Sequence, residues 1–162
     1  NTFNNLGYKN VYGFDASNSG IELAKRTFPH IADRFFNHDV YEPNLPSSVL
    51  QKYDVIISME VIEHLYSPKT YLDNCRLWLK DNGFLIITTP YHGYLKNLLI
   101  ALLNKFDSHF NPLWEGGHIK FFSKKTLSLL LEKTDFRILS FYGAGRLPFL
   151  WKSMILVGQK NG

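Results

Sequence analysis

Two apolar runs of strand length constrain the fold more than any other feature of this chain. They are YDVIIS, residues 53–58, and FLIITT, residues 84–89. Between them, SPKTYLDNCRLWLKDNG (67–83) begins with a capping Ser67 and with Pro68 at the first helical position, and it closes on an Asn-Gly turn. Continuous apolar strands joined by a helix are typical of a parallel sheet covered on both faces. The chain therefore predicts an α/β fold with right-handed crossovers.

The remaining elements extend this pattern in both directions. The predicted upstream elements are a helical turn closed by Gly7, a strand over 11–14, a helix over 17–28 capped by Ser17 or Asn18, and a strand over 34–38. The predicted downstream elements are a helix over 94–106, a helix over 123–133, and a strand pair over 137–145 and 153–159. We predict a Rossmann-like doubly wound sheet with a C-terminal antiparallel hairpin, in one domain spanning residues 1–162. An insertion at about 91–117 interrupts it, and such long connections are usually functional.

A nucleotide-binding sheet of this kind normally opens with a strand and a Gly-rich turn before its first helix. The first residues, NTFNNLGYKN, contain neither. We therefore expect the first strand and the Gly-rich turn to lie upstream of Asn1, outside this chain.

Composition favours a cytoplasmic domain. The 162 residues are 45% apolar and contain one cysteine, Cys75, whose helical context predicts a small buried residue in a reducing compartment. No apolar run reaches the roughly 20 residues of a membrane span. The helix at 94–106 leaves open a peripheral membrane contact or a homodimer. A net charge of +4, with a small basic cluster at Lys120, Lys124 and Lys125, is too mild to predict a nucleic-acid partner.

Acidic residues follow two neighbouring predicted strands. Asp15 ends the first, where a carboxylate can accept two ribose hydroxyls of an adenosine cofactor. Asp39 ends the next, where a carboxylate could accept from the exocyclic amine of a purine. The alternative is that each acid caps the element that follows. Spacing alone leaves NAD, nucleotide sugars and S-adenosylmethionine open as ligands.

Five segments together resemble one family. VYGFDAS, HDV, YDVIISMEVIEHL, GFLIITTPYH and GGHIKFFSKKTL are similar to the class I S-adenosylmethionine-dependent methyltransferases, in the branch resembling ubiquinone-biosynthesis O-methyltransferases. The terminal strand pair is similar to the antiparallel hairpin that separates this family from dehydrogenases. The glycine-rich first motif of the family is absent from the chain. The resemblance implies a methyltransferase that uses S-adenosyl-L-methionine.

Carried over by position, the resemblance implies that Asp15 binds the ribose, Asp39 the adenine amine, and Met59 the cofactor by packing or by its backbone. Ala16 and Val40, beside the two acids, would flank the adenine. The predicted cofactor-binding residues are Asp15, Ala16, Asp39, Val40, Met59 and Glu60.

The segment EVIEH places three ionisable residues directly after a predicted strand. Glu60 is spaced i,i+3 from Glu63 and i,i+4 from His64, so a helical turn would put all three on one face. With His118 they could bind Mg²⁺, Mn²⁺, Fe²⁺ or Zn²⁺. The layout resembles metal-assisted O-methyltransferases of small-RNA ends and of quinone precursors, where a cation binds the acceptor oxygens and activates a hydroxyl.

Two other roles stay open for these residues. His64 or His118 could act as a general base without a metal, which gives a predicted catalytic set of Glu63, His64 and His118. Alternatively, Glu63 and His64 could hydrogen-bond neighbouring backbone and position the turn. Methyl transfer from a sulfonium is an in-line displacement that depends mainly on alignment, so no nucleophilic triad is required.

The acceptor pocket is expected in the insertion, with candidate walls at Tyr91, Tyr94, Phe110, Trp114 and His118. We predict O-methylation of a small-molecule, glycan or lipid-linked acceptor. A catalytically inactive domain of the same fold that binds adenosine or a partner is the alternative, and an RNA 2′-O-methyltransferase is a third. A nicotinamide dehydrogenase is disfavoured by the terminal hairpin and by EVIEH.

Overall fold

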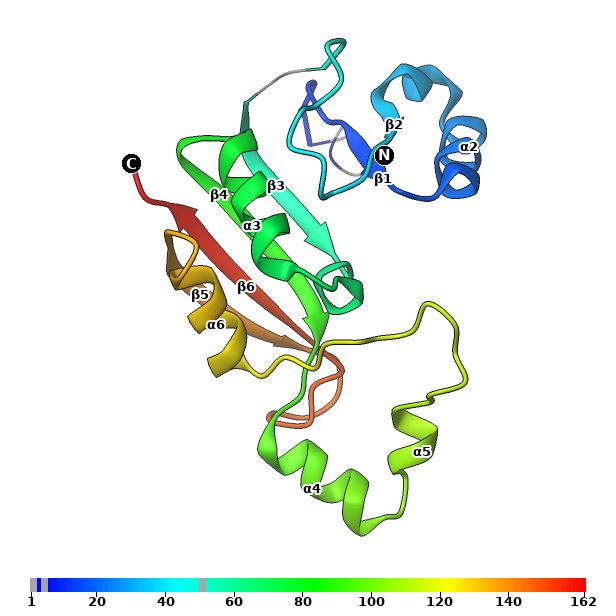
Figure 1. Ribbon diagram of the computed structural model, residues 1–162, viewed down its shortest axis with the longest axis vertical. Helices are drawn as coiled ribbons and strands as arrows, with labels where there is room; N and C mark the ends of the chain where they lie inside the picture. Colours follow the sequence, from blue (N-terminus) through cyan, green and yellow to red (C-terminus); the bar gives the residue numbers. More distant parts are fainter. Residues whose placement is uncertain (1–2, 4–5, 50–51) are drawn as a thin grey trace. The chain divides into compact units, whose positions relative to one another are not determined.

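A computed structural model describes residues 3, 6–49 and 52–162. The chain divides into two units, 1–51 and 52–162, and each is described by itself (Figure 1). The helical turn predicted before Gly7 falls largely outside the described residues, although Gly7 itself has the positive φ of 88° that suits a glycine closing a helix. The single-domain organisation stays a prediction.

The first unit pairs two short parallel strands. β1 (Gly13–Asp15) aligns with β2 (Phe35–Asn37), so that Asp15 lies opposite Asn37. Between them are α2 (Asn18–Thr27) and the 3₁₀ helix η1 (Pro29–Arg34). The predicted cap of α2 is confirmed, because Ser17 Oγ accepts from the Gly20 amide at 3.1 Å. Both predicted strands are present with shifted bounds.

The second unit contains a four-stranded mixed sheet in the order β3-β4-β6-β5. Its strands are β3 (Tyr53–Met59), β4 (Leu79–Pro90), β5 (Phe136–Ala144) and β6 (Ser153–Lys160). β3 and β4 are parallel, while β6 runs antiparallel to both β4 and β5. The predicted α/β class and the C-terminal antiparallel hairpin are therefore confirmed.

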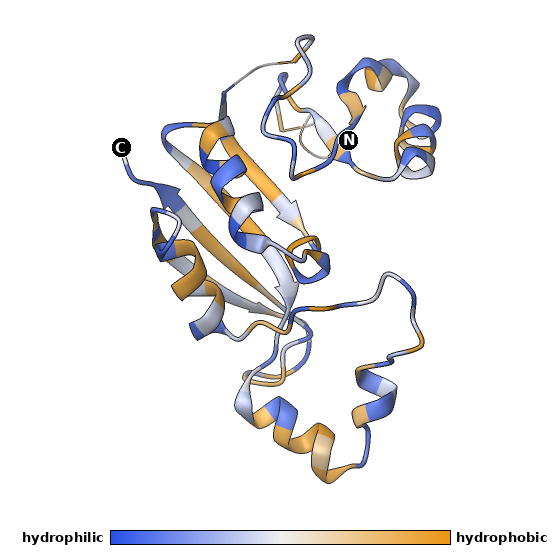
Figure 2. Ribbon diagram, in the orientation of Figure 1, coloured by the Kyte–Doolittle hydropathy of each residue, from blue (hydrophilic) through white to orange (hydrophobic). Residues whose placement is uncertain are grey.

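Two helices of the second unit cover one face of this sheet (Figure 1). Its helical elements are η2 (Ile62–His64), α3 (Pro68–Trp78), α4 (Tyr94–Leu102), α5 (Phe106–His109) and α6 (Lys124–Glu132). Figure 1 shows α3 and α6 on the same face of the sheet. Leu72 of α3, Leu85 of β4, and Leu127 of α6 are fully buried and belong to the core. Figure 2 shows α4, within the insertion, as a largely apolar helix.

The sheet differs from the prediction in two respects. β4 begins at Leu79, directly after α3, because buried Leu79 pairs with Tyr53 before the Asn-Gly turn. Gly83 is required there, since a Cβ would lie 2.9 Å from the Lys80 carbonyl oxygen. The runs expected to be covered on both faces instead alternate, and Val55 and Ile57 of β3 are 44% and 41% exposed.

Within the described ranges, no helix has both the length and the apolar character needed to cross a membrane.

Candidate active site at the carboxyl ends of β3 and β4

The chain turns sharply where β3 ends. Met59 is the last residue of the strand and is exposed, and Glu60 adopts a left-handed conformation with φ of 52°. The Glu60 amide donates to the Thr88 carbonyl at 3.1 Å, and the Thr88 hydroxyl donates to Glu60 Oε1 at 2.9 Å. This strained turn is therefore fixed to the end of the neighbouring strand at both backbone and side chain.

Glu63 is the buried acid of the site. Its side chain is 1% exposed, within η2, and its Oε2 accepts from the Thr89 hydroxyl at 3.0 Å. Among the described residues, nothing donates to Glu63 Oε1, which is itself buried. Burial raises the pKa of this carboxyl. A buried carboxylate oxygen without a donor is costly unless a proton or a cation satisfies it.

His64 is held in a defined orientation by the returning chain. Its Nδ1 donates to the carbonyl oxygen of Gly116 at 2.9 Å, with that of Gly117 at 3.2 Å. A carbonyl oxygen can only accept, so Nδ1 carries a proton, and in the neutral tautomer that fits this contact Nε2 carries the lone pair. This backbone contact is the usual way in which a ligating or basic histidine is oriented.

His118 completes a three-residue cluster. Its ring centroid lies 4.8 Å from that of His64, and the ligand atoms of Glu63, His64 and His118 all lie within 4.8 Å of one another. Burial and the neighbouring His64 lower the pKa of His118, which favours the neutral imidazole that a metal or a proton requires. The predicted catalytic residues are thus brought together in space.

One carboxylate and two imidazoles are suitable ligands for a divalent transition-metal ion. The orphaned Oε1 of Glu63 and the free Nε2 of His64 fit such an ion. Glu60, also a predicted ligand, lies outside this three-residue group, and its Oε1 accepts from the Thr88 hydroxyl. Its role as a ligand stays a prediction.

A cavity of about 330 Å³ opens onto the two histidines of this cluster, while Glu63 is buried and is not among its lining residues. His64 and His118 line it together with Trp114, whose ring lies edge-on to both imidazoles at 6.3 and 5.4 Å. Among the other predicted aromatic walls, Tyr94 is 84% exposed and Tyr91 is buried against Trp151. None of Tyr91, Tyr94 and Phe110 lines this cavity, whose aromatic walls are Trp114 and Tyr66.

In the first unit, the two acids predicted to bind adenosine lie at the ends of adjacent strands, Asp15 as the last residue of β1 and Asp39 two residues after β2. Asp15 Oδ1 accepts from the Ser17 amide at 2.7 Å, and Asp39 Oδ1 accepts from the Tyr41 amide at 2.9 Å. Each therefore has one oxygen in a local turn, although neither caps a helix, since Ser17 is the cap of α2 and no helix directly follows Asp39. Ala16 follows Asp15 and is exposed, and Val40 follows Asp39 and is half-buried. Their roles in cofactor binding stay predictions.

Sequence reasoning missed three contributors. Thr88 and Thr89 each donate a hydrogen bond to one glutamate of EVIEH. In the sequence, only the presence of two hydroxyl residues at the end of an apolar strand could have indicated this role. The Glu63 carbonyl oxygen accepts from the Ile119 and Lys120 amides, both at 2.9 Å. No local pattern indicates that contact, since it joins segments more than 50 residues apart.

Known proteins share this arrangement of elements. The chain is 26% identical over 144 residues to human mitochondrial ubiquinone biosynthesis O-methyltransferase. The matched region covers 86% of this chain and 38% of that protein. It is 27% identical over 140 residues to the ubiquinone biosynthesis O-methyltransferase of Coxiella burnetii, covering 82% of this chain and 56% of that protein. The chain thus spans about half the length of these curated relatives, or less.

Magnesium protoporphyrin IX methyltransferase from Synechocystis PCC 6803, solved with bound SAH, has a similar fold. The TM-score is 0.68 at 16% identity, with 96% of this chain and 66% of that chain covered. This likeness confirms the predicted Rossmann-like class. Over residues 2–140 the chain also matches the family described as the methyltransferase domain. The chain belongs to this family, the class I S-adenosylmethionine-dependent methyltransferases.

Proposed function

We propose that the protein carrying this chain is an S-adenosylmethionine-dependent O-methyltransferase, with a divalent cation bound by Glu63, His64 and His118. Family membership supports methyl transfer, and the relatives named as O-methyltransferases support an oxygen acceptor. The observation that carries the metal is the buried Oε1 of Glu63, which has no donor among the described residues and lies beside two imidazoles.

In this reaction the acceptor oxygen forms a bond to the methyl carbon as the carbon–sulfur bond of the sulfonium breaks. The sulfur keeps the electron pair, S-adenosylhomocysteine leaves, and the acceptor hydroxyl loses its proton. A divalent cation bound at the cluster would lower the pKa of that hydroxyl and so favour the oxyanion. The protein's contribution is alignment and electrostatic stabilisation.

The described residues have separate tasks in this scheme. Thr89 positions Glu63, and the carbonyl oxygens of Gly116 and Gly117 position His64. Trp114 forms an apolar wall beside the acceptor oxygen. A small-molecule, glycan or lipid-linked acceptor fits this description, and the cytoplasm is the proposed location. We further propose that Asp15 and Asp39 bind the ribose and adenine of the cofactor.

The test combines a binding assay with an activity assay. Mn²⁺ is titrated calorimetrically into the metal-free protein, and transfer of a labelled methyl group from S-adenosylmethionine to catechol is then followed. We expect one Mn²⁺ per chain, and methyl transfer that is lost on chelation and restored by Mn²⁺. Glu63→Gln should lose both, while Glu115→Gln, a change at an exposed glutamate of the insertion, should keep both.

The possible results separate the parts of the proposal. Methyl transfer that survives exhaustive chelation would refute the metal and favour His118 as general base, because its lowered pKa keeps it neutral at pH 7. A protein that binds S-adenosylhomocysteine and transfers no methyl group to any oxygen acceptor would refute the O-methyltransferase assignment.

A further inference from the structure

A second cavity, of about 660 Å³, lies in the same unit between α4, α5 and the loop that joins β5 to β6. Its lining residues belong to two chemical kinds. The apolar ones include Leu99 of α4, Leu103 directly after it, and Leu147 and Leu150 of the loop. The basic ones are Lys96, Lys105, His109 and Arg146. No acidic side chain lines it. It shares no lining residue with the cavity at Glu63, His64 and His118.

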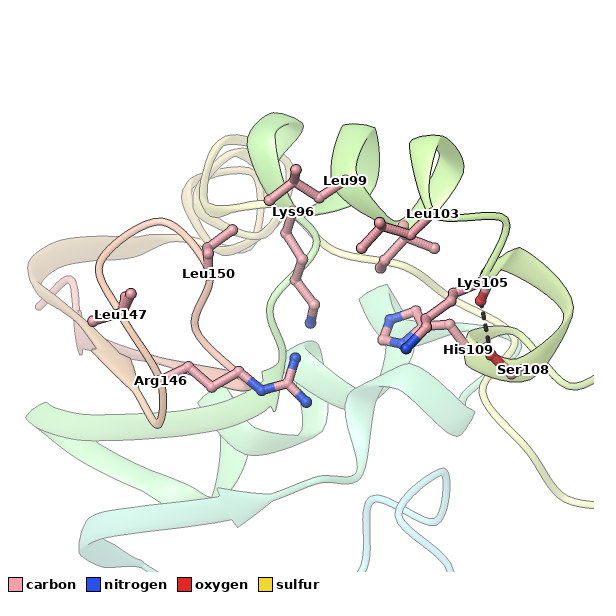
Figure 3. Close-up of a pocket in the computed structure, with 10 residues that line it drawn as sticks. Lys96, Leu99, Leu103, Lys105, Ser108, His109, Arg146, Leu147 and Leu150 are labelled. Atoms are coloured by element: carbon pink, nitrogen blue, oxygen red, sulfur yellow. Dashed lines mark hydrogen bonds between the residues drawn. The ribbon is translucent and has the colours of Figure 1, made fainter.

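The basic side chains converge on one part of this cavity. Figure 3 shows Lys96, from α4, and Arg146, from the loop, pointing toward each other across it. Lys96 is 5% exposed, and its Nζ donates to the Tyr91 carbonyl at 2.7 Å. Within the described part of the chain, neither Lys96 nor Arg146 belongs to an ion pair with a carboxylate. Two cations are thus concentrated in a partly buried space without a counter-ion, and an anion would stabilise them.

The charged neighbours that shift the pKa values of Lys96 and His109 are all basic. Burial and then Arg146 lower the pKa of Lys96. Burial, Lys96 and Arg146, in that order, lower the pKa of His109. Arg146 is also held at a left-handed φ of 61°, a conformation that costs a non-glycine residue free energy. The loop therefore bears backbone strain at the residue that brings the second cation to the cavity.

The apolar part of the cavity is incompletely covered. Leu103 is 62% exposed and Leu147 is 70% exposed, although both line the cavity. The amide of Leu103, the residue that ends α4, donates to the Leu99 carbonyl at 3.0 Å, so these two leucines lie one turn apart. Leu147 and Leu150 come from the loop (Figure 3). An apolar chain lying along these leucines would remove their surface from water.

We propose that this cavity binds a single-chain anionic amphiphile, with its acidic head between Lys96 and Arg146 and its apolar chain along the four leucines. The cavity volume falls within the range of about 300 to 1,000 Å³ typical of small-ligand sites. A carboxylate and a phosphate monoester share the required head-group chemistry, since both accept hydrogen bonds from ammonium and guanidinium groups. The site is separate from the proposed methyl-transfer cluster, and its occupancy requires no turnover.

The test is calorimetric titration with dodecanoate and with dodecyl phosphate, both below micelle-forming concentrations. We expect binding of one molecule per chain for at least one of the two, and the tighter one identifies the head group. Inorganic phosphate and dodecyltrimethylammonium serve as probes for the head alone and for a head of opposite charge. Both should bind at least tenfold more weakly than the better amphiphile.

Two variants remove the cations in different ways. Arg146→Gly deletes the guanidinium and suits the positive φ, so it should leave the fold intact. Lys96→Met deletes the ammonium and keeps an unbranched apolar stem at a buried position. Each should weaken amphiphile binding at least tenfold. Lys125→Gln, at an exposed position of α6 outside the cavity, is the matched control and should leave binding unchanged.

Four results would overturn the proposal. One is the absence of binding by both anionic amphiphiles, and another is equal binding of the cationic amphiphile. The third is undiminished binding by Arg146→Gly in a protein whose circular dichroism spectrum is unchanged. Association with phosphatidylglycerol vesicles without binding of either soluble amphiphile would also overturn it, because the same cations would then face a membrane surface. Methyl transfer to catechol is measured in parallel, so failure here is distinguishable from failure of the proposed function.

Discussion

Thr89 donates a buried hydrogen bond of 3.0 Å to Glu63, while the residue before it, Thr88, donates one of 2.9 Å to Glu60. Successive side chains of a strand point to opposite faces, so the two hydroxyls are presented on different sides of β4. Thr89 is fully buried, and Thr88 is only partly so. The end of a single strand therefore positions both glutamates of EVIEH.

Replacing Thr89 with valine should destabilise the protein, because the buried carboxylate of Glu63 would lose the hydrogen bond that the Thr89 hydroxyl donates to it. A buried acceptor left unsatisfied costs about 1–3 kcal/mol. Thr88→Val is the matched control, and we expect it to cost less than about 1 kcal/mol because water can replace the exposed hydroxyl. Urea denaturation at neutral pH measures both values. Equal losses in the two variants would contradict the positioning role of Thr89.

The protein should lose stability in mild acid through His92. Burial, followed by Lys96 and His109, lowers the pKa of this histidine from 6.5 to about 4. A depressed pKa contributes stability above the unfolded value of 6.5, and this contribution is lost as the pH falls toward 4. Since one pKa unit corresponds to about 1.4 kcal/mol, the free energy of unfolding should fall by about 1–3 kcal/mol over this window.

His92→Leu removes the titrating ring and should flatten that part of the pH profile. His30→Leu, a change at an exposed histidine of the first unit, is the control and should leave the profile as it is. Denaturation curves recorded between pH 4 and 7 make the comparison. A wild-type profile that is flat between pH 6.5 and 4 would count against the buried, neutral His92.

Metal binding should be visible in the fluorescence of Trp114, whose ring lies edge-on to His64 and His118. We expect a saturable change of emission on addition of Mn²⁺, absent in Glu63→Gln. Trp114→Phe should abolish the change while retaining calorimetric binding, since Trp78 and Trp151 do not line that cavity. A signal that persists unaltered in Trp114→Phe would place the ion elsewhere.

Asp15→Asn should separate the two roles of Asp15. The amide oxygen can still accept from the Ser17 amide, so the turn before α2 should be preserved. The loss of one charged acceptor should weaken binding of S-adenosylhomocysteine by about 1–3 kcal/mol. Calorimetry in the full-length protein measures this, with the melting temperature as a check on folding. Unchanged affinity would leave Asp15 as a turn residue only.

Cys75 should be inert toward thiol reagents in the folded protein. Its side chain is fully buried, and burial raises the pKa of its thiol to about 12. Ellman's reagent at pH 8 should therefore label the thiol only after denaturation. Rapid labelling of the folded protein would contradict its place in the core.

Much of this fold follows from local patterns. The cap at Ser17, the helix start at Pro68 and the terminal strand pair were all predictable, because each depends on a few neighbouring residues. The start of β4 at Leu79 was not. It depends on pairing with Tyr53, which lies 26 positions earlier in the chain.

In the candidate site, too, features set by neighbouring residues were predictable and features set by distant contacts were not. The proximity of Glu63 and His64 follows from their adjacency, and His118 was predicted from its place directly after the insertion and from the chemistry of its imidazole. The contacts that orient them could not be predicted, because the His64–Gly116 bond spans 52 residues and depends on the path by which the insertion returns. Similarly, the i,i+4 spacing did not place Glu60 with His64, because the left-handed turn at Glu60 replaces the expected helix there.

The insertion is bonded at both of its ends. The Tyr91 amide donates to the Lys152 carbonyl at 3.2 Å and the His92 amide to the Phe122 carbonyl at 3.1 Å, while Ile119 and Lys120 are fixed to Glu63. Residues 93–115 can therefore be exchanged as a cassette without disturbing the anchor points of the sheet, because lengthening a closed loop costs little free energy. In such a design, replacing residues 93–115 would change the acceptor preference, while Glu63, His64 and His118 would stay unchanged in sequence and position.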